Sequence, residues 1–135
     1  QKLGGSIIFI ASKNALSASK GASAYSVAKS SLLHLSRSIA FEGSEFKVRS
    51  NIVNPDAVIQ GSKIWEGKWK SERAANNNIK INEVEDFYKK RSLLKVNILP
   101  SDIAEAVAFF ASSKSIKSTG NILNVDGGNI TSFTR

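Results

Sequence analysis

The sequence predicts an α/β fold with a parallel sheet, and three observations point to it. A short apolar run, "GGSIIFIAS", precedes a long segment whose apolar residues recur with helical spacing, and a second strand, "KVRSNIVNP", follows that segment and closes at a proline. A third short run, residues 122–125, follows a second segment with helical spacing. Apolar runs without alternation are typical of strands buried on both faces of a parallel sheet. Strand, helix and strand in this order form the right-handed crossover unit of such sheets.

The first crossover unit is predicted between residues 6 and 55. A buried strand over residues 6–11 is followed by a small, polar loop and then by a helix over residues 24–41, which is expected to end at Gly43. The next strand closes at Pro55, because proline is tolerated at a strand end better than within a central strand. The apolar positions through which the helix is expected to pack are Val27, Leu32, Leu35, Ile39 and Ala40.

The C-terminal elements are a helix in "LPSDIAEAVAFFAS" and a last strand over residues 122–125. Ser101 is the expected N-cap of this helix, and Asp102 lies in the first turn, where the helix dipole favours anions. After the last strand come Asp126 and two glycines, which permit a sharp turn. The apolar stripe of the helix consists of Ile103, Val107 and Phe110.

The intervening residues 57–99 differ in composition and predict a lid on the substrate side. They are rich in Asn and Lys and suggest one or two short helices, followed by a helix around residues 83–91. Trp65 and Trp69 are four residues apart in this segment. They either pack the lid onto the domain or touch substrate, since large aromatic side chains mostly bury area.

Composition indicates a single globular domain over residues 1–135, with 41% hydrophobic and 22% charged residues. The net charge is +8, but the basic residues are scattered and interleaved with acidic ones, which argues against nucleic acid as a partner. No apolar run is long enough to span a membrane, so a cytoplasmic protein is expected. Cysteine is absent and His34 is the single histidine, which excludes a thiolate metal site and a histidine-based triad.

Tyr25 and Lys29 lie four residues apart in "SAYSVAKSSLLHLSRSIAFE", at the start of the first predicted helix. A helix has about 3.6 residues per turn, so both side chains lie on one face and can act on one substrate atom. A tyrosine is a useful base for alcohol oxidation when a nearby ammonium stabilises its phenolate. The alternative is structural, with Tyr25 as a half-buried anchor and Lys29 as a surface lysine.

The order of five motifs resembles the short-chain dehydrogenase/reductase family. They are Ser12 after the first strand, Tyr25 thirteen residues later, Lys29, "NIVNP" and "GNILNVDGG". The resemblance implies the C-terminal half of a Rossmann-like, doubly wound parallel sheet with three α/β/α layers. It covers nearly the whole chain, but the glycine-rich phosphate turn, the acidic ribose-binding residue and the asparagine of the family's catalytic tetrad are missing.

A closer resemblance is to the dehydrogenase half of bifunctional rhamnulose-1-phosphate aldolase/alcohol dehydrogenase proteins. The segments that carry it are "VNPDAVIQGSKIW", "RSLLKVNILPSDIAEAVAFFAS" and the terminal "VDGGNITSFTR". It implies oxidation of lactaldehyde, or a related small hydroxy-carbonyl compound, in rhamnose catabolism. Because the chain starts at Gln1 without an initiator methionine, it is expected to be fused to, or part of, a longer chain.

The resemblance implies a role for each candidate site residue. Tyr25 is the base, Lys29 supports it and binds the cofactor ribose, and Ser12 holds and polarises the substrate oxygen. Relatives carry glycine at the position of Asp56, so this carboxylate either contacts substrate or faces water. Gln60 replaces a threonine that contacts the nicotinamide in relatives. The implied cofactor is NAD, with NADP open, and the positions near it are Tyr25, Lys29, Pro55, Asp56 and Val58.

Two functional interpretations remain open on these grounds. One is an oxidoreductase with a small-molecule substrate, whose long helix and last strand pair copies into a homo-oligomer, as in relatives. The other is a non-catalytic fold fragment or assembly module that lacks half of the cofactor site. The 135-residue chain alone is expected to bind NAD weakly and to self-associate through an unpaired sheet edge.

Overall fold

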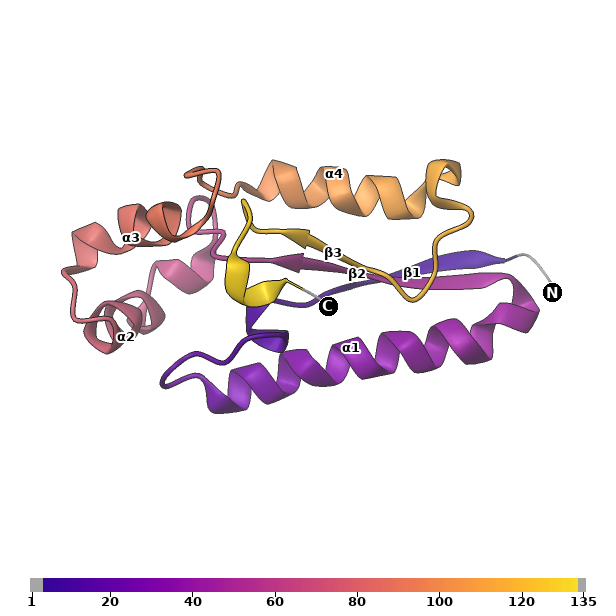
Figure 1. Ribbon diagram of the computed structural model, residues 1–135, viewed down its shortest axis with the longest axis horizontal. Coiled ribbons are helices and arrows are strands. Elements are labelled where there is room, and N and C mark those ends of the chain that lie inside the picture. The colour runs from indigo at the N-terminus through magenta and orange to yellow at the C-terminus, as the bar shows by residue number, and fades with distance from the viewer. Residues whose placement is uncertain (1–3, 134–135) are drawn as a thin grey trace.

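The computed structural model describes residues 4–133 and has a three-stranded parallel sheet in the order β1-β2-β3. Helix α1 covers one face of the sheet and α4 covers the other, while α2 and α3 lie beyond one end (Figure 1). The predicted three-layer α/β fold is confirmed. Gln1 and the last two residues of the terminal motif lie outside the described residues. The bounds are β1 Gly5–Ile10, α1 Ser23–Gly43, β2 Val48–Pro55, α2 Lys68–Asn76, α3 Val84–Arg91, α4 Pro100–Ala111 and β3 Ile122–Val125.

The core lies on both faces of the central strand, β2. Successive side chains of a strand point to opposite faces, so the fully buried neighbours Ile52 and Val53 belong to different clusters. Ile52 packs with Leu33 of α1 on one face. Val53 packs with Ala106 and Phe110 of α4 on the other, which confirms the predicted apolar stripe of that helix. The central strand therefore fixes α1 and α4 on opposite sides of the sheet.

Strand β1 is less buried than the sequence suggests. Within the described part of the chain it pairs only with β2, in the register Ile8↔Asn51. Ile7 and Ile10 keep 40% and 41% of their surface exposed. The expectation of burial on both faces is wrong for β1, because no element among residues 4–133 covers its outer edge.

Helix α1 ends at Gly43 as predicted, but its buried face differs from the expected stripe. Val27 and Leu35 are 71% and 46% exposed, so the prediction is wrong for them. Small side chains let this helix approach the sheet closely, and the buried Ser36 hydroxyl lies 2.9 Å from that of Ser50 in β2. Helical spacing alone did not show which face contacts the sheet. The buried positions of α1 are Leu33, Ser36 and Ala40.

Helix α4 begins one residue before the expected cap. Its N-cap is Leu99, and Pro100 occupies the first helical position, where the missing N–H leaves no bond unmade. The prediction of Ser101 as N-cap is therefore wrong. The Asp102 carboxylate accepts a hydrogen bond from the Leu99 N–H at 2.8 Å and stabilises the start of the helix.

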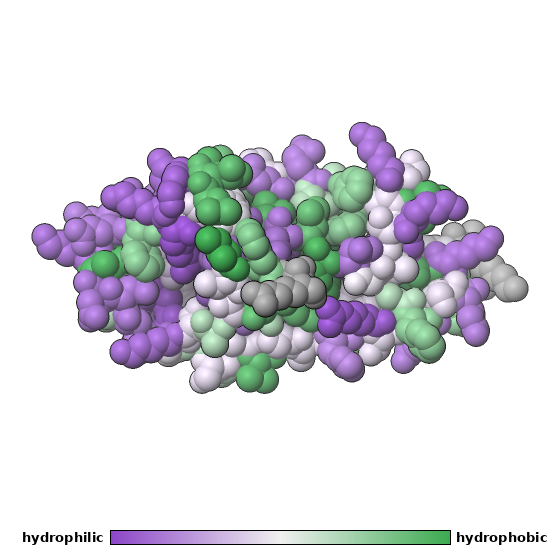
Figure 2. Space-filling view, in the orientation of Figure 1, coloured by the Kyte–Doolittle hydropathy of each residue, from purple (hydrophilic) through white to green (hydrophobic). Residues whose placement is uncertain are grey.

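Residues 57–99, the predicted lid, lie at the end of the sheet where the parallel strands finish (Figure 1). The predicted helix around residues 83–91 is present as α3. The lid has its own apolar cluster of Trp65, Ala74 and Val84. Its outer surface is mostly hydrophilic in Figure 2. No helix formed by residues 4–133 is both long and apolar enough to cross a membrane.

Candidate active site

A cavity of about 220 Å³ opens at the carboxyl ends of β1 and β2, between the sheet, the start of α1 and the lid. Open parallel α/β sheets bind their ligands at this edge. The structure brings all the predicted site residues together around this cavity. They are Ser12, Tyr25, Lys29, Pro55, Asp56 and Val58.

Tyr25 and Lys29 lie one turn apart on α1, both partly buried. The Lys29 Nζ is 5.9 Å from the centroid of the Tyr25 ring. It donates a hydrogen bond of 2.9 Å to the backbone carbonyl of Ile10, the last residue of β1. The strand end thus holds the Lys29 ammonium beside the Tyr25 ring, at the mouth of the same cavity.

Ser12 follows β1 and caps a short 3-10 helix, Lys13–Ala15. Its Oγ accepts a hydrogen bond from the Asn14 N–H at 3.2 Å. This bond uses a lone pair of the hydroxyl and leaves its proton available to a substrate oxygen. Ser12 therefore both caps the short 3-10 helix and lines the cavity.

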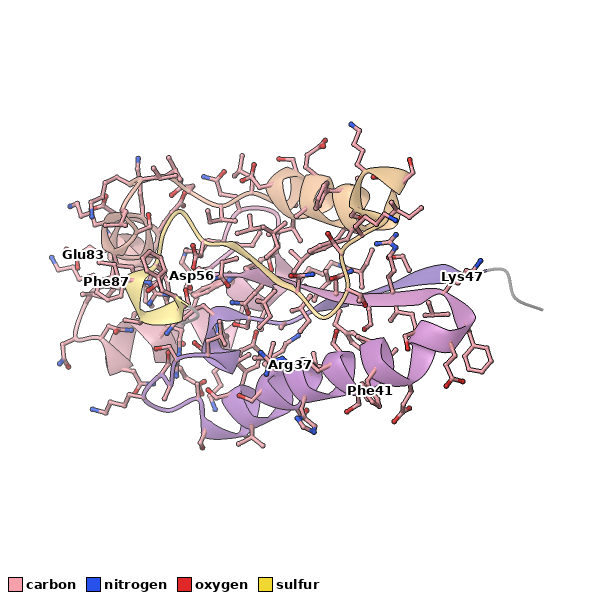
Figure 3. The ribbon with its side chains drawn as sticks, turned by 45° about the vertical axis from the view of Figure 1, so that its right-hand side comes forward. Arg37, Phe41, Lys47, Asp56, Glu83 and Phe87 are labelled. Atoms are coloured by element: carbon pink, nitrogen blue, oxygen red, sulfur yellow. The ribbon has the colours of Figure 1, made fainter. Side chains whose placement is uncertain are left out.

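Asp56 neither faces water nor presents a free carboxylate to the cavity. Its side chain is 8% exposed and forms an ion pair with Arg91 at the end of α3. Arg91 donates through Nε at 3.1 Å and through its terminal nitrogen to both carboxylate oxygens. Asn129 adds a third donor group at 2.9 Å. The expectation that Asp56 faces water is therefore wrong, and its contact with substrate stays a prediction. The carboxylate joins the end of β2 to α3 and to the C-terminal loop, at the position labelled in Figure 3.

The residues around the cavity fit one end of a nicotinamide cofactor. Pro55 and Val58 line the cavity beside Tyr25 and Lys29. The Asp56 carboxylate is held by Arg91 and Asn129, and a contact between Asp56 and the cofactor stays a prediction. Gln60 is exposed and donates to Glu85 at 2.5 Å, so its amide is engaged within the lid.

Several residues near the cavity carried no obvious signal in the sequence. Burial lowers the pKa of Lys13, and Arg91 lowers it further, while Asp56 opposes them. Burial also raises the pKa of Tyr88, whose ring lies 4.1 Å from the Arg91 guanidinium carbon. Arg73 of α2 is only 4% exposed. A basic residue in a hydrophilic segment is normally expected to face solvent. The one sequence signal for the burial of Arg73 is its position four residues after Trp69 on the same helix.

Among residues 4–133, no group of three His, Cys, Asp or Glu side chains is placed to hold a metal ion. His34 is exposed on α1. What the cavity offers is a hydroxyl, a phenol and an ammonium, a set suited to moving a proton at an oxygen atom.

The chain is similar to proteins described as oxidoreductases. Residues 1–129 match the profile of a family described as enoyl-(acyl carrier protein) reductase. The chain is 55% identical over its whole length to "Uncharacterized oxidoreductase YuxG" of Bacillus subtilis, of which it spans 20%. It spans about half of other curated relatives, such as 46% of the 2,3-dihydro-2,3-dihydroxybenzoate dehydrogenase of the same organism, to which it is 33% identical over 92% of its own length.

Solved structures of dehydrogenases share the fold. Sorbitol-6-phosphate 2-dehydrogenase SrlD from Erwinia amylovora superposes with a TM-score of 0.84 at 28% identity, over 92% of this chain and 48% of that one. A short chain dehydrogenase/reductase family oxidoreductase from Burkholderia thailandensis gives 0.77 at 33% identity, over 93% and 44%. The profile match, these relatives and the cavity geometry agree: the chain belongs to the short-chain dehydrogenase/reductase family.

Proposed function

We propose that this chain supplies the substrate side of an oxidoreductase active site, in which hydride passes between a nicotinamide cofactor and a small hydroxy or carbonyl compound. The observation that carries the proposal is the convergence of Ser12, Tyr25 and Lys29 on one cavity at the carboxyl ends of the strands. A non-catalytic module has no need for this convergence. The oxidoreductase interpretation is therefore favoured over the module.

Each of the three side chains has one task. In the oxidation direction, the Ser12 hydroxyl holds the substrate oxygen and Tyr25 removes its proton as the C–H hydride leaves. The Lys29 ammonium stabilises the resulting phenolate and binds a ribose hydroxyl of the cofactor. In the reduction direction, Tyr25 returns the proton to the carbonyl oxygen.

The proposed cofactor is NAD, with NADP as the alternative. A bound nicotinamide supplies the hydride acceptor or donor at C4 of its ring. Tyr25, Lys29, Pro55 and Val58 would hold the nicotinamide and its ribose, since these residues line the same cavity. An assay with each cofactor distinguishes NAD from NADP.

The proposed substrate is lactaldehyde or a related small hydroxy-carbonyl compound, within rhamnose catabolism. The resemblance to bifunctional rhamnulose-1-phosphate aldolase/alcohol dehydrogenase proteins supports it, and the cavity of about 220 Å³ accommodates a compound of a few carbon atoms. Oxidation of the aldehyde to an acid requires its hydrate, which supplies the hydroxyl for Tyr25. We further propose that the protein acts in the cytoplasm, as an oligomer, and as part of a longer chain.

The test is a steady-state assay of the full-length protein with lactaldehyde and either NAD or NADP, following formation of the reduced cofactor. Ser12→Ala should lower kcat by about 10²-fold, the scale of a lost substrate-oxygen contact, with little change in cofactor KM. Lys29→Ala should lower kcat and also raise cofactor KM. His34→Gln, an exposed substitution on the same helix, is the control. If both site variants behave like His34→Gln, the assignment of the cavity is wrong.

A further inference from the structure

A buried arginine connects the lid to the start of the helix that carries Tyr25. Arg73 is 4% exposed, although it belongs to a short helix with a hydrophilic outer surface. Its two terminal nitrogens donate to the backbone carbonyls of Lys20 and Gly21, at 2.9 and 3.0 Å. These residues lie just before α1, which begins at Ser23. Two charge-assisted hydrogen bonds in a fork geometry fix both the distance and the orientation of this turn relative to Arg73.

The same arginine also stacks on the aromatic residue that touches Tyr25. The Arg73 guanidinium carbon lies 4.5 Å from the centroid of the Trp69 ring. The Trp69 ring is in turn 5.5 Å from the Tyr25 ring, at an interplanar angle of 50°. Arg73 and Trp69 are one turn apart on α2, so a single helix face presents both to the start of α1.

The approach of α2 to this turn depends on glycine. Gly21 has φ +67°, and a Cβ there would lie 2.7 Å from the Asn76 side-chain nitrogen and 3.1 Å from an Arg73 terminal nitrogen. A side chain at position 21 would strain the backbone and crowd Asn76 and Arg73, so glycine favours the approach of Arg73 to the two carbonyls. The glycine at position 21 therefore allows the close contact between this turn and Arg73.

The arginine is costly to bury, which argues that it is more than a packing residue. Among residues 4–133 no carboxylate forms an ion pair with it, and its Nε has no hydrogen-bond partner. A buried charge without a counterion is destabilising unless the surrounding structure compensates for it. An apolar side chain of similar length would fill the space without this penalty, but would not fix the orientation of the turn.

We propose that Arg73 is a positioning residue for Tyr25. It sets the Lys20–Gly21 turn, from which α1 starts, and it holds Trp69 against the Tyr25 ring, so that the phenol oxygen stays aligned with the substrate oxygen. This inference rests on the proposed role of Tyr25 as the base. A misplacement of about 1 Å at a reacting group costs up to about 10²-fold in rate.

The experiment is a double-mutant cycle in the full-length protein, read as kcat. Arg73→Gln should lower kcat by about 10-fold or more when Tyr25 is present, because the base is misaligned. In a Tyr25→Phe background, Arg73→Gln should change the residual kcat by less than about 2-fold, because the group that it positions is gone. Lys68→Gln removes an exposed charge from the same helix and should have no effect in either background.

Two outcomes would overturn the inference without affecting the proposed function. One is an equal effect of Arg73→Gln in both backgrounds, which indicates a general structural role. The other is unchanged kcat in Arg73→Gln while Tyr25→Phe is inactive. If thermal melting shows that Arg73→Gln does not fold, Arg73→Lys replaces it in the same cycle, since this variant keeps the buried charge but loses the fork. If Tyr25→Phe itself retains full kcat, the proposed function fails instead.

Discussion

The ion pair between Asp56 and Arg91 should hold the lid closed over the cavity, and Asp56→Asn tests this directly. The substitution keeps the shape of the side chain but removes its charge. In the native protein Asp56 is 8% exposed and Arg91 is 26% exposed, and Asn129 also donates to the carboxylate. Arg91 is the link that joins α3 to the carboxyl end of β2.

The expected loss of stability follows from the burial of the pair. Removing one partner of a fully buried pair costs about 3–5 kcal/mol. Arg91 is partly accessible, so its guanidinium regains hydration when the carboxylate is lost. The expected loss in the free energy of unfolding is therefore about 2 kcal/mol. A change of this size raises the population of the opened lid by about 30-fold.

Hydrogen–deuterium exchange of the full-length protein measures this opening. Amides of α3 should exchange about 30-fold faster in Asp56→Asn, whereas amides of α4 should be unchanged. Asp86→Asn is a matched control, because it breaks the exposed pair with Lys90 on the same helix. If Asp56→Asn and Asp86→Asn change α3 exchange equally, the ion pair with Arg91 does not hold the lid.

Three further outcomes are expected. Burial lowers the pKa of Lys13, so the unfolded state binds more protons between that pKa and the ordinary value of 10.5. Stability should therefore rise with pH across this window, and Lys13→Met should remove the rise in thermal melting. Gly127→Ala should destabilise by about 1–2 kcal/mol in the same assay, because φ is +64° and a Cβ would meet Ser92, whereas Gly5→Ala meets no atom within 4 Å and should be neutral. The 135-residue chain alone should self-associate in analytical ultracentrifugation, since β1 has an open edge in the described sheet, and a clean monomer at high concentration would contradict this.

The order and type of the main elements could be predicted because each has a local signal. The end of α1 at Gly43, the end of β2 at Pro55 and the limits of β3 all depend on residues next to one another in the chain. The face of α1 could not be predicted, because Ser36 is buried through a partner, Ser50, that belongs to another element. The cap of α4 was misplaced by two residues because Pro100 competes with Ser101 for the start of the helix.

In the candidate site, too, features set by neighbouring residues could be predicted, and those set by distant partners could not. The spacing of Tyr25 and Lys29 is a property of one helix, and Ser12 is placed by the end of one strand, so sequence was sufficient to bring them together. The roles of Asp56 and Arg73 depend on partners 35 and 53 positions away, Arg91 and Lys20, respectively. Such pairs leave no local sequence pattern, because their members come together only when residues 57–99 pack against the rest of the chain.

The central claim is that Tyr25 is the proton-transferring residue, and turnover of Tyr25→Phe in the full-length protein tests it most directly. Phenylalanine keeps the ring and its packing against Trp69 but removes the ionisable oxygen. With thermal melting unchanged, kcat should fall by about 10²-fold or more across a range of about pH 6 to 10. Wild-type turnover by Tyr25→Phe over that range would show that this helix face is structural and would contradict the account.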